Sequence, residues 1–311
     1  MTLDKAILAT LAYHDIFDYP LKKEEIASLL VGKKTSAKAV SVKIKHLENL
    51  RKIKQKGEFF FLKGRENLYN IRRVRQKYSN GKLKRAILYS KLLTPIPTIK
   101  LVAVSGALAM GNSHKSDDID LVIITQKNTI WTTRFLANLI LFPFKRKPPQ
   151  LPTTNYKRQT NNKACLNLFL DESDLKIRDQ NLYTAHEIAQ MKPLMDRGET
   201  YSRFIKANQW ILKYLPNWQT ILSPVISVPP SVIPAKLVLG PDRGAGIQLH
   251  LSILEKFLKK FQLTYMKPRI TTERIGEHQL FFHPQDTREW VLAEYQKRLK
   301  KLKILPLLSK T

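Results

Sequence analysis

Two aspartates, Asp118 and Asp120, stand two residues apart at the start of an apolar run that reads IDLVIIT. Such a run predicts a β-strand over 118–125, and residues two apart in a strand point to the same face. Two carboxylates on one face beside an open loop suit a hydrophobic core poorly. They suit Mg²⁺ well, because this hard cation prefers oxygen ligands. The spacing therefore predicts a metal site at Asp118 and Asp120.

The loop ahead of the aspartates, residues 105–118 (SGALAMGNSHKSDD), has the composition of a phosphate-binding turn. Gly106 and Gly111 allow the backbone to approach a ligand closely, and the small Ala107 and Ala109 keep the turn slim. Backbone N–H groups at the start of a short helix there could hold phosphate oxygens. A metal beside a phosphate-binding turn is an arrangement suited to nucleotidyl transfer.

The segment from Gly106 to Asp120 resembles the signature of the polymerase-beta-type nucleotidyltransferase superfamily. In that signature a glycine-containing turn is followed, after a short spacer, by a carboxylate, an apolar residue and a second carboxylate on a strand. Here eleven residues separate Gly106 from Asp118-Ile119-Asp120. The resemblance implies a Mg²⁺-dependent enzyme that binds ATP or another NTP, with Asp118 and Asp120 as catalytic metal ligands. It also implies a set of residues that contact the nucleotide: Ser105, Gly106, Ala107, Gly111, Ser116 and Asn167.

Two residues depart from the family pattern. Ala107 stands where a hydroxyl residue usually follows the first glycine, although Ser105 could compensate. Many members take a third carboxylate from a neighbouring strand, but the corresponding strand here, CLNLFLD, has Asn167, whose amide cannot accept a proton near neutral pH. Asp171, expected on the same face at the end of that strand, is the nearby substitute as catalytic base. Either Asp171 acts as the base, or two carboxylates suffice, or the site binds nucleotide without turnover.

Other candidate residues indicate weaker sites. His186-Glu187 begins like the zinc motif HExxH, but the second histidine is missing, so a capping or interdomain role is favoured. His114, Lys115 and Arg134 could help to bind a triphosphate, and each is equally well explained as a surface charge.

The composition points to a folded protein with a polyanionic partner. The chain of 311 residues holds 54 Lys+Arg against 25 Asp+Glu, a formal net charge of +29. Its single cysteine, Cys165, excludes an intramolecular disulfide and is expected to be a small buried hydrophobic residue. The N-terminus lacks the apolar segment of a signal peptide, and polar residues or prolines interrupt the apolar stretches 129–144 and 221–240. We therefore expect no membrane partner and a cytoplasmic location.

The first section of the chain, 1–81, predicts three short helices followed by a basic hairpin around Gly57, the layout of a winged helix. Such a unit could place its third helix in a major groove of nucleic acid, DNA or RNA, and its hairpin on the phosphates. The alternative is a winged helix that contacts protein. The basic residues in question lie on the third helix and the hairpin: Lys38, Lys43, Lys45, His46, Lys54, Lys56, Lys63 and Arg65.

The second section, 82–178, alternates helices and strands and predicts a small sheet with strands at 100–104, 118–125 and 164–170. Between the two sections, the Asn80-Gly81 dipeptide marks a turn or a helix end. The third section, 179–311, is expected to be mostly helical and to pack against the second. The chain therefore predicts an α+β (mixed α/β) fold, with a nucleotidyltransferase-like sheet flanked by an N-terminal winged helix and a C-terminal helical domain.

The function predicted is Mg²⁺-dependent transfer of a nucleoside monophosphate from an NTP to an acceptor that the sequence does not identify. The first alternative is a DNA-binding regulator whose nucleotidyltransferase-like module is an inactive sensor. Ala107 and Asn167, which depart from the family pattern, support this alternative. A weaker alternative is the nucleotidylating half of a toxin–antitoxin pair. The sequence does not indicate an oligomeric state.

Overall fold

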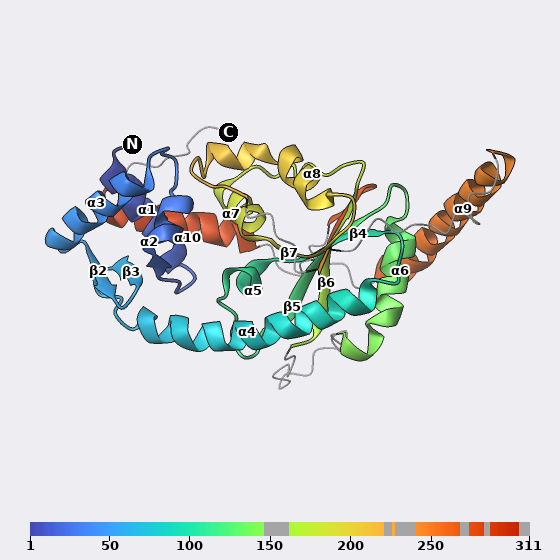
Figure 1. The fold of residues 1–311 in the computed structure, drawn as a ribbon, viewed down its shortest axis with the longest axis horizontal. Coiled ribbons are helices and arrows are strands. Elements are labelled where there is room, and N and C mark those ends of the chain that lie inside the picture. The colour runs from blue at the N-terminus through green and yellow to red at the C-terminus, as the bar shows by residue number, and fades with distance from the viewer. Residues whose placement is uncertain (146–161, 221–225, 228–240, 268–273, 283–286, 305–311) are drawn as a thin grey trace.

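The computed structural model of the chain describes residues 1–145, 162–220, 226–227, 241–267, 274–282 and 287–304. It is an α+β fold in which helices flank a mixed seven-stranded sheet, and a three-stranded sheet lies near the N-terminus (Figure 1). The predicted fold class is thereby confirmed.

The N-terminal part begins with three helices and ends in a hairpin, the order that the sequence predicted. Thr2 and Ser36 cap the first and third helices, with their side chains accepting from the Lys5 and Ala39 N–H groups at 3.4 and 3.2 Å. These residues cap well because a hydroxyl oxygen satisfies an N–H that has no partner within the helix. The elements are α1 (Leu3–Asp15), β1 (Leu21–Lys22), α2 (Lys23–Ser28), α3 (Ala37–Asn49), β2 (Ile53–Lys56) and β3 (Phe59–Leu62), and the strands pair in the order β1-β3-β2.

One long helix, α4 (Leu68–Leu93), connects the N-terminal part to the large sheet (Figure 1). It runs without a break through Asn80-Gly81, where the sequence predicted a turn or a helix end. An interior glycine costs a helix only about 1 kcal/mol relative to alanine, and contacts on both sides offset that cost. Gln76 donates to the Asn80 side chain at 3.0 Å one turn earlier, and Ser79 and Lys82 are buried against the loop that follows α5.

The large sheet has the strand order β8-β7-β4-β5-β6-β10-β9, so the predicted strands of the second section lie at its centre. β4 pairs antiparallel with β5 and β7, whereas β5 and β6 run parallel and are joined through α6. The elements are β4 (Ile99–Val104), α5 (Gly106–Met110), β5 (Ile119–Thr125), α6 (Ile130–Ile140), the 3₁₀ turn η1 (Phe142–Phe144) and β6 (Ala164–Asp171).

The third section is not only helical, because it adds strands to both edges of the same sheet. The first helix of this section ends at Gln190, and Lys192–Asp196 is a strand within a section that was expected to be mostly helical. Pro193 explains the change, since it lacks an N–H and disfavours helical backbone at the residue before it. The elements are α7 (Leu182–Gln190), β7 (Lys192–Asp196), α8 (Thr200–Ala207), η2 (Gln209–Lys213), β8 (Ile226–Ser227), α9 (Pro241–Met266), β9 (Arg274–Ile275), β10 (Gln279–Phe281) and α10 (Thr287–Lys301).

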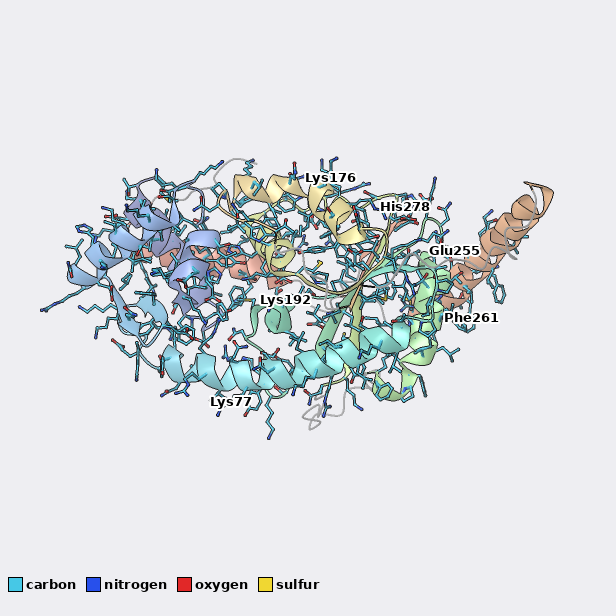
Figure 2. The ribbon with its side chains drawn as sticks, in the orientation of Figure 1. Lys77, Lys176, Lys192, Glu255, Phe261 and His278 are labelled. Atoms are coloured by element: carbon cyan, nitrogen blue, oxygen red, sulfur yellow. The ribbon has the colours of Figure 1, made fainter. Side chains whose placement is uncertain are left out.

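The two faces of the large sheet carry separate hydrophobic cores. α7 and α8 pack on the face that presents Val122 and Ile124, and this core continues through α10 into the N-terminal helices. α4, α6 and α9 pack on the face that presents Leu121 and Ile123. On that side Glu255 of α9 lies against the start of α6, as Figure 2 shows, and its carboxylate accepts the Trp131 and Thr132 N–H groups at 2.7 and 2.8 Å. None of the described helices is long and apolar enough to span a membrane.

Candidate functional site

The turn after β4 has the backbone that its two glycines predicted. Ser105 precedes α5, and its N–H donates to the Asp120 carbonyl at 3.3 Å. Gly106 has φ +60° and Gly111, which ends α5, has φ +75°. Both values lie in the left-handed region that other residues adopt only with strain. α5 ends at this left-handed Gly111, where the Asn112 N–H donates to the Ala107 carbonyl at 2.8 Å.

Asp120 is the carboxylate that this turn approaches most closely. A Cβ atom built on Gly106 would lie 3.6 Å from Asp120 Oδ2, so even the smallest side chain at this position would contact that oxygen. Asp118 stands one residue before β5, half-buried, and its Oδ1 accepts the Lys163 N–H at 3.2 Å. Both carboxylates therefore stand at the start of a central strand, and Asp120 lies beside the Ser105–Gly106 turn.

A buried lysine holds the loop that carries Asp118. Lys82 of α4 is 2% exposed, and its ammonium donates to the Lys115 carbonyl at 3.2 Å, to the Asn162 side chain at 3.0 Å and to the Asp117 carbonyl. Burial lowers its pKa, and Asp117 and Asp118 act in the opposite direction. The basic helix α4 therefore does more than connect the N-terminal part to the sheet, because one of its lysines holds the aspartate loop.

Asn167 contacts Asp120, and a β-bulge in β6 places it there. β5 and β6 pair Leu121 with Leu166 and Val122 with Leu168, so Asn167 is an extra residue in β6 with no Cα partner. Its amide donates to Asp120 Oδ1, and its own oxygen is 2.8 Å from Cys165 Sγ. Bulges occur often beside active sites because they redirect a side chain. Cys165 itself is half-buried rather than fully buried.

The same bulge overturns the expected role of Asp171. With one residue inserted, the alternation of β6 shifts, and Asp171 falls on the face opposite Asp120 instead of sharing its face with Asn167. Asp171 also pairs with Thr125, five residues along β5 from Asp120, a separation of about 16 Å. Its buried carboxylate accepts the Asn128 N–H at 2.7 Å and the Ser173 N–H and hydroxyl at 2.9 and 2.7 Å. Asp171 therefore shapes a turn and is too distant to act on a group held by Asp120.

The carboxylate that lies near Asp120 is Glu187 of α7. Burial and, to a smaller extent, the negative charge of Asp120 together raise the pKa of Glu187 to about 7, against a hydrogen bond from the Gly106 N–H that lowers it. Sequence reasoning noticed Glu187 only as part of an incomplete zinc motif. The available signal was an acidic residue within the apolar stretch of an amphipathic helix, and that pattern alone does not reveal which strand the helix packs against.

The remaining predicted residues divide between the site and other surfaces. Ser105 lines a cavity together with Glu187, whereas Ser116, His114 and Lys115 line a separate groove against α4. Arg134 lies elsewhere, because its guanidinium is buried between α6 and α9, bonded to the Gln262 side chain. Ser116 is therefore not beside Ser105, and the structure does not support the expectation that Arg134 reaches the aspartate loop.

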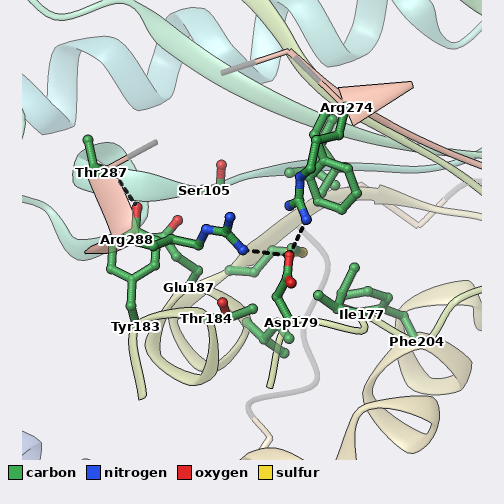
Figure 3. Close-up of a pocket in the computed structure, with 15 residues that line it drawn as sticks. Ser105, Ile177, Asp179, Tyr183, Thr184, Glu187, Phe204, Arg274, Thr287 and Arg288 are labelled. Atoms are coloured by element: carbon green, nitrogen blue, oxygen red, sulfur yellow. Dashed lines mark hydrogen bonds and ion pairs between the residues drawn. The ribbon is translucent and has the colours of Figure 1, made fainter. Parts of the chain in front are cut away.

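The cavity beside Ser105 and Glu187 has a volume of about 110 Å³. Its walls come from β5 and β6 on one side and from α7 and α8 on the other (Figure 3). Arg274 and Arg288 also line it, and both reach Asp179. A pocket with apolar walls and a few converging polar groups is the usual form of a small-molecule site.

The basic residues of the N-terminal part are not equally available to a partner. Lys38 and Lys45 are exposed on α3, as a groove-binding helix would require. Lys43, in contrast, pairs with Asp4 at 3.1 Å, and Arg65 pairs with Asp15 and Asp18 at 2.7 and 2.5 Å. The paired residues hold the N-terminal part together, which leaves α3 with a narrower basic surface than the sequence predicted.

Within the described part of the chain, no group of three or more His, Cys, Asp or Glu side chains is arranged to hold a metal ion. Searches with this sequence and structure match no family model, no curated protein and no solved structure.

Proposed function

We propose that the protein transfers a nucleoside monophosphate from an NTP to an acceptor, with the reaction centred on Asp120. The observation that supports this most directly is the approach of the glycine turn to Asp120. Gly106 lies in left-handed backbone, and a Cβ atom built on it would lie 3.6 Å from Asp120 Oδ2. A phosphate that shares a metal ion with Asp120 could therefore approach this turn, and glycine-containing turns are common anion-binding sites.

The side chains present fit Mg²⁺ as the cofactor. Mg²⁺ is commonly bound by one or two carboxylates, with water and substrate phosphates as its other ligands. Asp118 and Asp120 supply those carboxylates, so a third protein carboxylate is not needed to hold the ion. Bound there, Mg²⁺ would neutralise the triphosphate and the leaving pyrophosphate.

The protein's own groups then position the reactants and remove a proton. The acceptor oxygen forms a bond to the α-phosphorus, the bond from that phosphorus to the β-phosphate oxygen breaks, and pyrophosphate leaves. Glu187 receives the acceptor's proton, because its carboxylate lies beside Gly106 and Asp120 where Asp171 cannot reach. Asn167 orients Asp120 through its amide and takes no proton.

The experiment that tests this function uses the full chain with each labelled NTP, Mg²⁺ or Mn²⁺, and RNA, DNA, protein or small-molecule acceptors. Asp118→Asn combined with Asp120→Asn should abolish both the labelling of any acceptor and the release of pyrophosphate without unfolding the chain. Asp174→Asn is the matched control, because Asp174 pairs with Arg178 at 3.1 Å on the surface. Activity that survives the double substitution would falsify the metal assignment.

The exposed lysines of α3 favour a second candidate, a DNA-binding regulator whose nucleotide module does not turn over. This candidate predicts tight NTP binding, no pyrophosphate release and DNA binding that weakens steeply with salt. Lys38→Gln combined with Lys45→Gln should lower the slope of log K against log salt by about 2. The pair Lys206→Gln and Lys213→Gln, on exposed positions of α8 and η2, is the control. Equal effects of the two pairs would show that only overall charge matters.

A further inference from the structure

We propose that the groove between α4 and residues 114–116 binds a single strand of nucleic acid, with Tyr78 stacking on a base and Lys115 contacting a phosphate. This groove is separate from α3 and from the cavity beside Ser105. The further assignment of the bound strand as the acceptor of the transferred nucleotide rests on the proposed function, whereas the binding itself does not.

The groove has the size of a ligand site, because its volume of about 690 Å³ lies within the usual range of about 300–1,000 Å³. One wall is α4, which contributes Asn70, Val74 and Tyr78. These residues stand four apart, a spacing that places side chains on one face of a helix. The other wall is the loop of residues 114–116.

Hydrogen bonds between the two walls fix the shape of the groove. The ammonium of Lys82 on α4 donates to the Lys115 carbonyl at 3.2 Å. Arg75, which also lines the groove, donates to Asn112 Oδ1 at 3.2 Å and pairs with Asp18 at 3.4 Å, so it supports the wall. A site whose walls are already in place loses less entropy on binding.

Tyr78 and Val74 give the groove an exposed apolar surface, since they are 37% and 49% exposed. The ring of Tyr78 contacts no other aromatic ring and no cation in the described part of the chain. Tyr69, in contrast, has Lys56 and Arg73 against its ring. Stacking of bases on exposed aromatic rings is a common way to bind single strands without sequence preference. A duplex keeps its bases stacked inside, so this surface favours a single strand.

The charge around the groove suits a polyanion. Lys115 is exposed, and none of the described residues that line the groove is acidic. Arg73, Lys77 and Lys84 of α4 are also exposed and pair with no described carboxylate. Figure 2 shows Lys77 on the outer side of α4. These three cations extend over about 16 Å of helix, so the basic surface is long enough for a strand of several nucleotides.

The groove is connected to the loop that carries Asp118. Ser116, which lines the groove, stands two residues before Asp118, so their Cα atoms are at most about 7 Å apart. Lys82 donates to the carbonyls of both Lys115 and Asp117. A strand in the groove therefore lies near a proposed metal ligand, and its terminal hydroxyl would be the acceptor.

Fluorescence anisotropy on the full chain tests the groove with four probes. They are oligothymidine and oligouridine single strands of about twelve nucleotides, a length within the range of known single-strand sites, a DNA duplex of equal length, and polyglutamate. We expect at least one single strand to bind more tightly than polyglutamate. Tyr78→Ala should weaken that strand at least fivefold, equivalent to about 1 kcal/mol, and should leave any binding of the duplex unchanged.

Matched variants separate the groove from general effects of charge and folding. Trp290→Ala, at an aromatic residue of α10 that is 59% exposed and does not line the groove, should leave strand binding unchanged. Tyr78→Phe keeps the ring and should bind as the wild type does. Lys115→Gln should lower the slope of log K against log salt by about 0.7. Lys206→Gln, at an exposed position of α8, should not change this slope.

Four results would overturn the proposal: no binding of either single strand, equal binding of polyglutamate, equal weakening by Tyr78→Ala and Trp290→Ala, or equal weakening of strand and duplex by Tyr78→Ala. The outcomes also separate this inference from the proposed function. Asp120→Asn should leave strand binding intact while it abolishes nucleotide transfer. Strand binding in a wild-type protein that transfers no nucleotide would reject the proposed function and retain the groove. Transfer by a protein that binds neither single strand would reject the groove and retain the function.

Discussion

Acid should destabilise this protein through a buried histidine, His14 of α1, which joins the N-terminal part to α7. His14 is fully buried, and its Nδ1 is 2.9 Å from the Thr10 carbonyl. Its ring meets that of His186 edge-to-face with centroids 5.1 Å apart, and His186 in turn stacks on Tyr13 at 3.9 Å. Among the described residues, Nε2 of neither histidine has a hydrogen-bond partner. A proton added at Nε2 would therefore create a buried charge without a partner.

The size of the effect follows from the pKa of His14. The pKa of His14 in the folded protein is lowered from 6.5 to about 4. Burial is the main cause and the positive charge of Arg72 adds to it, whereas the hydrogen bond to the Thr10 carbonyl acts in the opposite direction. Because the folded-state pKa is depressed, the unfolded chain binds the proton more readily. Stability is thus complete above the unfolded pKa and is lost as the pH falls from 6.5 toward 4. Between about pH 7.5 and about pH 5 the loss from His14 amounts to about 2 kcal/mol.

Urea denaturation at several pH values measures this contribution. His14→Phe keeps an aromatic ring against Tyr13 and His186 but removes the titrating group. The free energy of unfolding of the wild type should fall by about 2 kcal/mol more than that of the variant across this pH interval. The pKa of His186 is also lowered well below its usual value, so His186→Phe should act in the same direction. Parallel pH profiles for wild type and His14→Phe would refute the reasoning, because they would mean that His14 takes up a proton without penalty in the folded state.

Three further substitutions test the positions assigned to residues around the site. Asp171→Asn should cost roughly 2–3 kcal/mol of unfolding free energy, because its carboxylate accepts three short hydrogen bonds, and should leave nucleotide transfer unchanged. A transfer rate that falls as it does for Asp120→Asn would restore Asp171 to the site. Lys82→Met should cost roughly 2 kcal/mol and speed hydrogen exchange in residues 112–118, since it removes the ammonium that holds this loop. Unchanged exchange would show that the loop does not depend on Lys82. Gly106→Ala should cost about 1 kcal/mol or more through its φ of +60° and should reduce transfer, and equal stability and activity would contradict the role given to this glycine.

Local patterns in the chain were sufficient to place the main elements near the site. Alternation and apolar runs predicted β4, β5 and β6. Gly106 and Gly111 adopt left-handed backbone, which glycine allows without strain. The neighbourhood of Asp120 and Asn167 was also predicted, because both lie near the starts of strands that were expected to pair. These features depend on a few consecutive residues, so periodicity and residue type reveal them.

The composition of the site depended on contacts between distant segments. The bulge at Asn167 shifts the alternation of β6 and moves Asp171 to the other face, and no pattern within CLNLFLD marks it. Glu187 approaches Gly106 only because α7 packs on that face of the sheet. Arg274 and Arg288 meet at Asp179 only because β9 and α10 return to it. Periodicity in the sequence assigns a residue to one face of its own helix or strand. Which other helix or strand packs against that face depends on the tertiary packing of the whole chain.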